Sequence, residues 1–339
     1  MNNFNYIRAN SPSEASDQVL NADGAMLIAG GTNLVDLWKY NLLHPKLLVD
    51  INHLSECHSI TELEDGGLRL GALVSNADTA YHPLVEERYP LLSKAILAGA
   101  SAQIRNMATN GGNLLQRTRC YYFYDPDAPC NKRNPGSGCS AIEGYNRIHA
   151  ILGASSACIA VFPSDMCVAL AALGAVVQVV GKNGERSIPF TDFHRLPGDT
   201  PEVDNALQPG ELITSIDLPG HGFARHYSYL KLRDRHSYAF ALVSVATALD
   251  IEDGVIRDAR IALGGVAHKP WRVADAEASL VGKEANEESF AAAADIILQG
   301  AQGFQYNQFK IELAKRAIIR NGMMALHPET QLPGAQPSA

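Results

Sequence analysis

The stretch Ala25–Lys39 reads AMLIAGGTNLVDLWK and carries the signals that decide the fold of the N-terminal half. Its first five residues form a short apolar run, which is typical of a buried strand. Two glycines interrupt this run, and the apolar residues after them recur with helical spacing as far as Tyr40. The stretch therefore predicts a strand, a glycine turn and a helix, in that order.

This glycine turn has two interpretations. The first N–H groups of a helix lack partners within the helix, so a glycine turn there can hold a phosphate closely. Alternatively, Thr32 or Asn33 only caps the helix. A second glycine segment, Ala108–Leu115 (ATNGGNLL), again places small donors beside open backbone. Two such segments suit a pyrophosphate held from both sides, although neither has the Rossmann dinucleotide spacing.

The remaining patterns predict an α+β protein with two domains. Residues 1–220 form the first domain, which includes an insert at 116–160; residues 221–328 form the second, and residues 329–339 form an unstructured tail. Helical patterns cover 13–20, 32–40, 85–102, 165–173, 288–299 and 309–321. Strand patterns cover 25–29, 47–51, 68–73, 175–180, 185–190, 211–219, 227–231, 241–251 and 255–263.

Composition excludes several classes of protein. With 339 residues, 46% hydrophobic and 19% charged, the chain has the composition of an ordinary globular protein. Its formal net charge of -8 argues against a nucleic-acid binder. The first fifteen residues do not have the pattern of a signal peptide. The longest apolar stretch, Cys167–Val180, is too short to span a membrane.

Four of the six cysteines lie between positions 120 and 158, in a segment with no strand or helix period. Their spacing is C-x9-C-x8-C-x18-C, without the close pairs of zinc knuckles. Clustered thiolates select zinc or iron-sulfur clusters, and wide spacing favours an iron-sulfur cluster held by an irregular loop. Five basic and three acidic residues between 116 and 147 would compensate its negative charge. A zinc site, unligated thiols and Cys167 as a ligand in place of Cys158 remain alternatives.

Four motifs together resemble a known family. They are AGGTNL at 29–34, QIRNMATNGGNLL at 103–115, SDMCVALAALGA at 164–175 and RIALGGVAHKP at 260–270. The chain resembles the flavoprotein subunits of the molybdenum hydroxylases, the xanthine dehydrogenase and aldehyde oxidoreductase group, over about positions 4–325. The resemblance implies an FAD-binding domain of the p-cresol methylhydroxylase type, with two α/β subdomains. It also implies a C-terminal α+β domain of the carbon monoxide dehydrogenase flavoprotein type.

The resemblance also implies which residues contact FAD. The first glycine segment would wrap the diphosphate with Leu27, Ile28, Ala29, Gly30, Gly31, Thr32, Asn33 and Leu34. The second would line the other side with Thr109, Gly112 and Asn113. Asp165 matches an acidic FAD contact, Ile213 a backbone contact to the flavin portion, and Lys231 a lysine near the cofactor. From the residues alone, Asp165 could be a helix cap and Lys231 a solvated strand lysine.

The cysteine-bearing insert resembles that of the aldehyde oxidoreductase members, whose FAD subunit carries a 4Fe-4S cluster. Its ligands here would be Cys120, Cys130, Cys139 and Cys158. The implied function is an electron relay in a heterotrimer with a molybdenum-cofactor subunit and a 2Fe-2S subunit, which delivers electrons to an external acceptor. No catalytic side chain is expected in this chain.

The implied location is the periplasm, reached by export with a signal-bearing partner; otherwise the protein would stay in the cytoplasm. Two other functions remain open at the level of sequence. One is a self-sufficient flavin oxidase with a zinc-stapled loop, and the other is a structural subunit without a redox role.

Overall fold

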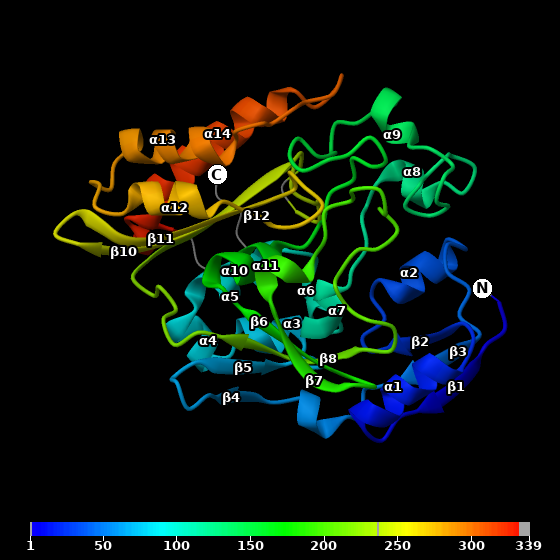
Figure 1. Ribbon diagram of the computed structural model, residues 1–339. Coiled ribbons are helices and arrows are strands. Elements are labelled where there is room, and N and C mark those ends of the chain that lie inside the picture. Colours follow the sequence, from blue (N-terminus) through cyan, green and yellow to red (C-terminus); the bar gives the residue numbers. More distant parts are fainter. Residues whose placement is uncertain (1, 236, 332–339) are drawn as a thin grey trace.

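The computed structural model describes residues 2–235 and 237–331, which contain three sheets and their covering helices (Figure 1). The first sheet is parallel and has the order β1-β3-β2. The glycine turn follows its edge strand β2, as the sequence predicts. The helix after that turn is shorter than expected, because Thr32 and Asn33 lie outside it. The elements of this unit are β1 (Asn5–Arg8), α1 (Pro12–Asn21), β2 (Ala25–Ile28), α2 (Leu34–Lys39), β3 (Leu47–Asp50) and the 3-10 turn η1 (Ser55–Cys57).

The second sheet is antiparallel and has the order β4-β5-β8-β6-β7. Its strands are β4 (Ile60–Glu62), β5 (Leu68–Gly71), β6 (Val176–Gly181), β7 (Gly184–Pro189) and β8 (Leu212–Leu218). The helices beside it are α3 (Asn76–Ala80), α4 (Pro83–Arg88), α5 (Pro90–Ala98), α6 (Ala102–Arg105), α7 (Asn110–Leu114), α10 (Asp165–Leu173) and α11 (Phe190–Phe193). Every residue of α10 is buried, so this helix is a core element.

The single helix predicted at 85–102 is wrong. The chain forms α4, then α5, then α6. Pro90 causes the first break, because a proline disfavours helical backbone at the residue before it, and Tyr89 has ψ 50°. Gly99 ends α5 with extended backbone. The short strands β1 and β4 were not predicted, since three or four residues are too few to establish a period.

The third sheet, β12-β11-β10-β9, lies between two layers of helices (Figure 1). One face packs on α5 and α10, and the other on α12 and α14, with α13 packed against these two helices. The elements are β9 (His226–Leu232), β10 (Val243–Glu252), β11 (Val255–Gly264), β12 (Trp271–Arg272), α12 (Ala274–Leu280), α13 (Glu287–Ile297) and α14 (Phe309–Ala325). The predicted strands followed by helices are confirmed, with α12 and β12 added.

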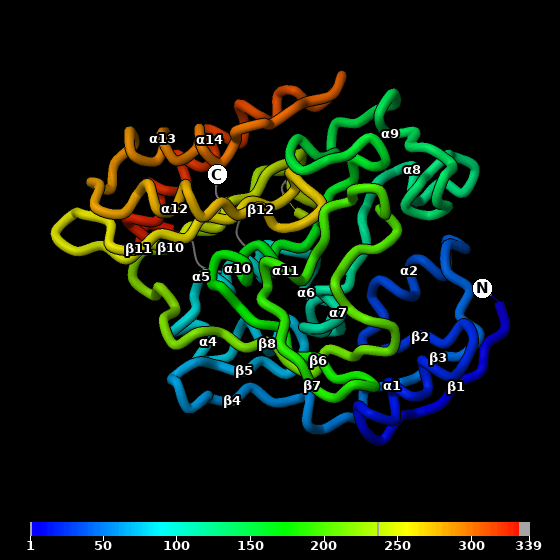
Figure 2. The backbone as a smooth tube through the Cα atoms, in the orientation of Figure 1, coloured from blue at the N-terminus to red at the C-terminus, as the bar shows by residue number. Residues whose placement is uncertain are grey.

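The insert follows an irregular path from α7 to α10, beside α2 on one side and the third sheet's loops on the other (Figure 2). Its only helices in the described chain are the single turns α8 (Tyr121–Tyr124) and α9 (Ser140–Glu143). Side-chain packing on the cysteines, rather than regular structure, therefore orders this segment.

The prediction of an unstructured tail from residue 329 is wrong at its first residues, which are ordered. Pro328–Thr330 forms the 3-10 turn η2, and the Gln331 side chain donates to the carbonyls of Tyr227 and Met324, each at 2.9 Å. Residues 332–339 lie outside the described residues. Within the described part of the chain, none of the helices has the length and apolar content that crossing a bilayer requires.

Candidate cofactor-binding site

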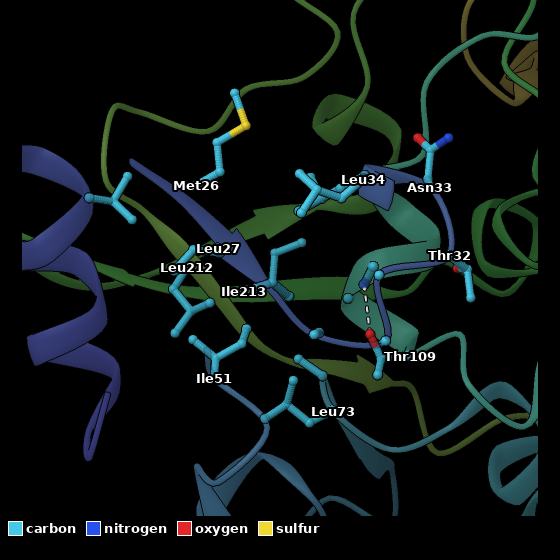
Figure 3. A pocket seen from close by; sticks show the side chains of 18 of the residues that line it. Met26, Leu27, Thr32, Asn33, Leu34, Ile51, Leu73, Thr109, Leu212 and Ile213 are labelled. Atoms are coloured by element: carbon cyan, nitrogen blue, oxygen red, sulfur yellow. Dashed lines mark hydrogen bonds between the residues drawn. The ribbon is translucent and has the colours of Figure 1, made fainter. Parts of the chain in front are cut away.

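A cavity of about 350 Å³ opens where the β2–α2 turn meets α7 and β8 (Figure 3). Ten of the residues predicted to contact FAD line it. They are Leu27, Ala29, Gly30, Gly31, Thr32, Asn33, Leu34, Thr109, Gly112 and Ile213. The remaining walls are mostly apolar and include Met26, Leu37, Leu43, Ile51, Leu73, Leu115 and Leu212. The two glycine segments, about eighty positions apart in the sequence, therefore form one site.

Gly30 brings these two segments into contact. A Cβ atom at this position would lie 1.7 Å from the carbonyl oxygen of Met107, which directly precedes the second segment. Gly31 has φ +70°, a left-handed conformation that side chains other than glycine rarely adopt. The turn therefore requires glycine twice, once for space and once for backbone conformation.

The second segment is ordered by its own cap. Thr109 precedes α7, and its hydroxyl oxygen accepts the Gly112 N–H at 3.2 Å (Figure 3). Gly111 is buried against Ala72 and donates its N–H to the Ala72 carbonyl at 2.8 Å. These bonds fix the backbone of α7 at the rim of the cavity.

Two charged residues that the sequence did not single out also line the cavity. Arg117 lies at the start of the insert, and its backbone N–H donates to the Asn33 side chain at 2.9 Å. Glu211 pairs with Arg186 at 2.6 Å, and the hydrogen bond from Arg186 lowers the pKa of this carboxyl. Nothing in a single sequence distinguishes Arg117 from the other basic residues of the insert.

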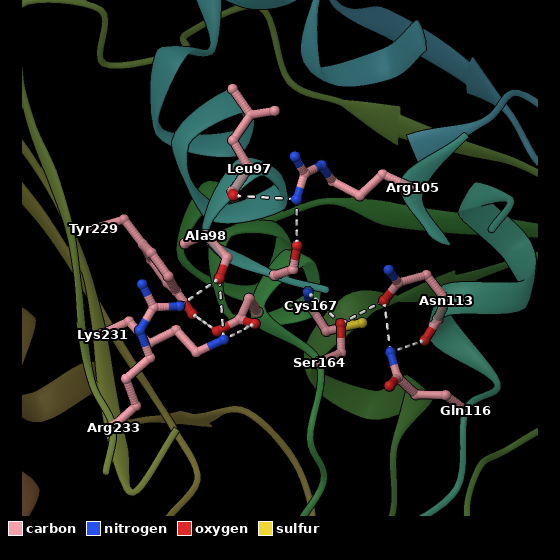
Figure 4. Close-up of polar contacts among 12 residues, drawn as sticks. Leu97, Ala98, Arg105, Asn113, Gln116, Ser164, Cys167, Tyr229, Lys231 and Arg233 are labelled. Atoms are coloured by element: carbon pink, nitrogen blue, oxygen red, sulfur yellow. Dashed lines mark hydrogen bonds and ion pairs between the residues drawn. The ribbon is translucent and has the colours of Figure 1, made fainter. Parts of the chain in front are cut away.

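Four predicted contacts lie outside the cavity lining: Ile28, Asn113, Asp165 and Lys231. Asn113 connects α7 to α10, because its carboxamide oxygen accepts the Ser164 hydroxyl at 2.5 Å (Figure 4). Its amide also donates to Asn76 at 2.7 Å. Asn113 thus has a role in holding two elements together, whatever else it contacts.

Asp165 and Lys231 form a buried ion pair at the first residue of α10 (Figure 4). The Lys231 ammonium lies 2.8 Å from the carboxylate and 3.1 Å from the Ala98 carbonyl. Tyr229 donates its hydroxyl to the same carboxylate at 2.7 Å, and burial raises the pKa of Tyr229. The interpretations of Asp165 as only a cap and Lys231 as a solvated lysine are therefore wrong, and Ser164 is the cap.

The four clustered cysteines pack together in one small core. Cys120, Cys130 and Cys158 are buried, Cys139 is half-buried, and all four belong to one cluster with Phe123, Ile159 and Leu37 of α2. A β-bridge joins Cys130 to Cys139. All six cysteines lie within the described residues, and all are free thiols rather than disulfides. The sulfurs are thus neither scattered nor oxidised in pairs.

Backbone amides point at these sulfurs. Cys120 and Cys139 directly precede the one-turn helices α8 and α9, whose first N–H groups lack helical partners. The amides of Tyr122 and Phe123 lower the pKa of Cys120, and those of Ala141, Ile142 and Ile159 lower the pKa of Cys139. Burial nevertheless raises the pKa of Cys120 to about 12, whereas a hydrogen bond from Cys158 lowers that of Cys139 to about 6.

The basic residues of the insert make ion pairs and hydrogen bonds with the surrounding protein. Arg117 and Lys132 both pair with Asp204, Arg119 pairs with Asp36, and Arg147 pairs with Asp234. Arg133 donates to backbone carbonyls within the insert. Four of the five cations therefore attach the insert to acids elsewhere in the protein. Of these four, Lys132 also lies near Cys158 and lowers its pKa, against the larger raising effects of Cys139 and burial.

The other two cysteines lie apart from this group. Cys167 is buried in α10 within the main core, and Cys57 is buried beneath the first sheet. Cys158 and Cys167 are the two candidates for the fourth ligand. Of these, Cys158 packs with Cys120, Cys130 and Cys139, and Cys167 does not. Among residues 2–235 and 237–331, no three His, Cys, Asp or Glu side chains converge closely enough to hold a single metal ion.

Comparison with known proteins agrees with this architecture. Residues 2–221 match the family described as the FAD binding domain in molybdopterin dehydrogenase. Residues 226–305 match the CO dehydrogenase flavoprotein C-terminal domain. The chain belongs to the flavoprotein subunits of the molybdenum hydroxylases. The family and the fold class predicted from the four motifs are confirmed.

Individual members of the family match almost end to end. The FAD-binding subunit PaoB of the Escherichia coli strain K12 aldehyde oxidoreductase is 50% identical, over 94% of this chain and 96% of that protein. The glyceraldehyde dehydrogenase medium chain of Sulfolobus acidocaldarius is 30% identical, over 84% of this chain and 83% of its own. The quinoline 2-oxidoreductase structure from Pseudomonas putida 86 superposes with a TM-score of 0.74 at 26% identity, covering 97% and 99% of the two chains.

The cavity of this flavoprotein subunit fits the cofactor of its family. Open backbone at the glycine turn suits a diphosphate, Gly112 of α7 has no side chain to fill the space beside it, and the apolar walls suit a flat ring system. The Asn33 side-chain nitrogen has no hydrogen-bond partner among the described residues, although it is buried. A buried donor of this kind is usually satisfied by a ligand or water. The residues present therefore fit FAD.

Proposed function

We propose that this flavoprotein subunit is the electron-transfer part of a molybdenum-dependent aldehyde oxidoreductase and carries both FAD and a 4Fe-4S cluster. Its partners would be a molybdenum-cofactor subunit and a 2Fe-2S subunit in a heterotrimer, with an external electron acceptor. The aldehyde assignment is supported by the names of two relatives, an aldehyde oxidoreductase subunit and a glyceraldehyde dehydrogenase chain. The observation that carries the relay is the packing of four free cysteines beside the cofactor cavity.

The cavity residues would bind FAD without taking part in bond making. The backbone N–H groups of Gly31 and Thr32 lie at the rim, and Arg117, which is paired with Asp204, lies beside them. Asp165 and Lys231 are held rigidly by their mutual ion pair. When bound, FAD supplies the ability to accept electrons singly and deliver two, while the protein supplies orientation and electrostatics.

The cysteine group supports a cluster better than a single metal ion. In a 4Fe-4S cluster each cysteine binds a separate iron at one corner of a cube, so the sulfurs do not converge on one point. Zinc instead requires its ligands around one centre, and no such convergence exists among the described residues. Amide donors toward Cys120, Cys139 and Cys158 would stabilise the charge of bound thiolates.

A single layer of side chains separates the two sites. Leu37 of α2 lines the cavity and also packs in the core around the cysteines, and Leu43 does the same from the following loop. Asn33 joins the cavity to the insert through the Arg117 backbone. This contact supports electron transfer between the sites, because the route passes through packed protein rather than through solvent.

Domain limits and location complete the proposal. We propose an FAD domain at 1–220 with the insert at 116–160, and a second domain at 221–328, in keeping with the family matches at 2–221 and 226–305. Periplasmic location by export with a partner follows from the family resemblance of the insert. Fractionation of cells that express all three subunits, with and without the partner's signal sequence, tests this location.

The test is purification of the complex without oxygen, followed by assays of flavin, iron and acid-labile sulfide. We expect one FAD and four irons in this subunit, beyond those of the 2Fe-2S partner. Cys130→Ser and Cys139→Ser should remove these four irons and keep most of the FAD. Cys57→Ala is the control, because Cys57 is also a free thiol but lies in another core.

Three results would contradict the proposal. Zinc without sulfide would indicate a stapled loop in a flavin oxidase. A colourless wild-type protein would indicate a structural subunit. Iron and sulfide contents unchanged in both serine variants would show that the cluster lies elsewhere.

A further inference from the structure

His149 is a buried histidine whose side chain faces the cysteine core. It is 1% exposed, and its Nε2 atom lies 3.1 Å from the sulfur of Cys120. The backbone amides of Tyr122 and Phe123 in α8 also favour the charged form of this thiol. His149 is therefore the side-chain donor among the described contacts of this thiol.

Both the backbone and the ring of His149 are fixed. Its carbonyl oxygen accepts the Lys310 ammonium at 2.8 Å and the Asn307 amide at 3.1 Å, both from the C-terminal domain. Its own N–H donates to the Asn146 carbonyl at 3.0 Å. The rings of Tyr121 and Tyr122 lie 6.4 and 6.3 Å from the imidazole, centre to centre. The imidazole can thus hold one orientation toward Cys120.

The chemistry of the pair sets the direction of the hydrogen bond. A metal-bound thiolate has lone pairs and no proton, so it can only accept. An imidazole nitrogen at 3.1 Å from it must then carry a hydrogen, because two facing lone pairs would repel. The second ring nitrogen, Nδ1, has no hydrogen-bond partner among the described residues, so it does not compete for this arrangement.

We propose that His149 donates an Nε2–H hydrogen bond to the Cys120 thiolate and thereby raises the reduction potential of the cluster. This inference rests on the proposed 4Fe-4S site. One-electron reduction adds negative charge to the cluster and its sulfurs, and a donor at sulfur stabilises that added charge. His149 is thus a positioning and tuning residue rather than a ligand. Lys310 and Asn307 make the C-terminal domain part of this tuning, since they hold the His149 backbone.

The experiment is a redox titration of the intact complex, monitored by the paramagnetic resonance of the reduced cluster. His149→Leu removes the donor, and His149→Gln keeps an amide N–H that can reach the sulfur. At a fixed potential near the wild-type midpoint, we expect the ratio of reduced to oxidised cluster in His149→Leu to fall on the order of tenfold, which is 59 mV for a one-electron couple. His149→Gln should lie closer to the wild type. His268→Leu is the control, because it removes another buried imidazole that donates to no thiol.

A second measurement does not depend on the leucine variant folding. Wild-type complex with ¹⁵N-labelled histidine should show a weak ¹⁵N coupling to the reduced cluster, and His149→Gln should lack it. Absence of the coupling in the wild type, or a wild-type potential in an iron-replete His149→Leu, would overturn the inference and leave the cluster proposal standing. Failure of the cluster proposal looks different, because the wild type itself would then lack the four irons and sulfide.

Discussion

Gly30 is a residue whose identity is set by a contact with a distant part of the chain. A Cβ atom there would overlap the Met107 carbonyl oxygen, which is backbone and cannot rotate away. Gly30→Ala should therefore separate the two glycine segments, cost about 1–3 kcal/mol of unfolding free energy and lower the flavin content severalfold. Urea unfolding and flavin absorbance per chain measure both effects. Gly282→Ala is the control for flavin content. Gly282 lies in the C-terminal domain with φ +78°, so this variant also strains the backbone, but it does so away from the cavity lining. Equal flavin loss in both variants would refute the argument.

Asp165 and Lys231 also depend on a contact between distant parts of the chain, in this case a buried ion pair. Their side chains are 8% and 5% exposed, so removal of one partner leaves a buried, uncompensated charge. Asp165→Asn should destabilise the protein by about 3 kcal/mol, and the double variant Asp165→Asn, Lys231→Met should recover most of that loss. Glu312→Gln, in an exposed pair on α14, should cost less than about 0.5 kcal/mol. Additive losses in the double variant would mean that the pair is not coupled.

Helix α14 is attached to the insert through a lysine that has no access to solvent. Lys310 donates to the carbonyls of His149 and Gly265, and burial lowers its pKa to about 7. In the unfolded chain a lysine pKa is about 10.4. Between these two values the unfolded state binds a proton that the folded state does not, so stability rises with pH across that window.

Lys310→Met tests this dependence. Between pH 7 and pH 9 the free energy of unfolding of the wild type should rise, relative to that of the variant, by on the order of 2 kcal/mol at most. Urea unfolding at the two pH values measures this difference. Lys315→Met on the same helix should leave this pH-dependent gain in stability intact, because the Lys315 side chain reaches solvent and pairs with Asp295. A wild type and a Lys310→Met variant that respond identically to pH would show that the buried amine does not titrate in this window.

The whole molecule is built around a core that both family domains share. Leu91, Leu170 and Ile216 of the first domain pack in one cluster with Tyr229 and Ala246 of the second. We therefore expect one thermal transition, seen alike by circular dichroism and flavin fluorescence. Free FAD at 100 times its dissociation constant should stabilise the protein by about 2.7 kcal/mol and raise this single transition. Two separated transitions would show that the domains unfold independently.

The sequence predicts a feature correctly when neighbouring residues decide it, and fails more often when distant residues decide it. The strand, glycine turn and helix at Ala25–Lys39 were predictable because their period and turn chemistry are local. The break at Pro90 was equally local but was hidden by the strong helical pattern on either side of it. The strands β1 and β4 could not be predicted, since so short a segment becomes a strand only through its neighbours.

The amino-acid sequence by itself determined the family, the two glycine segments and the set of four cysteines, because residue type and spacing carry these features directly. Tertiary structure alone decided that Gly30 meets Met107, that Asp165 pairs with Lys231, and that α2 lies between the cavity and the cysteines. The physical reason is that backbone preferences act over a few residues, whereas these contacts join segments brought together only when a common core buries their apolar side chains.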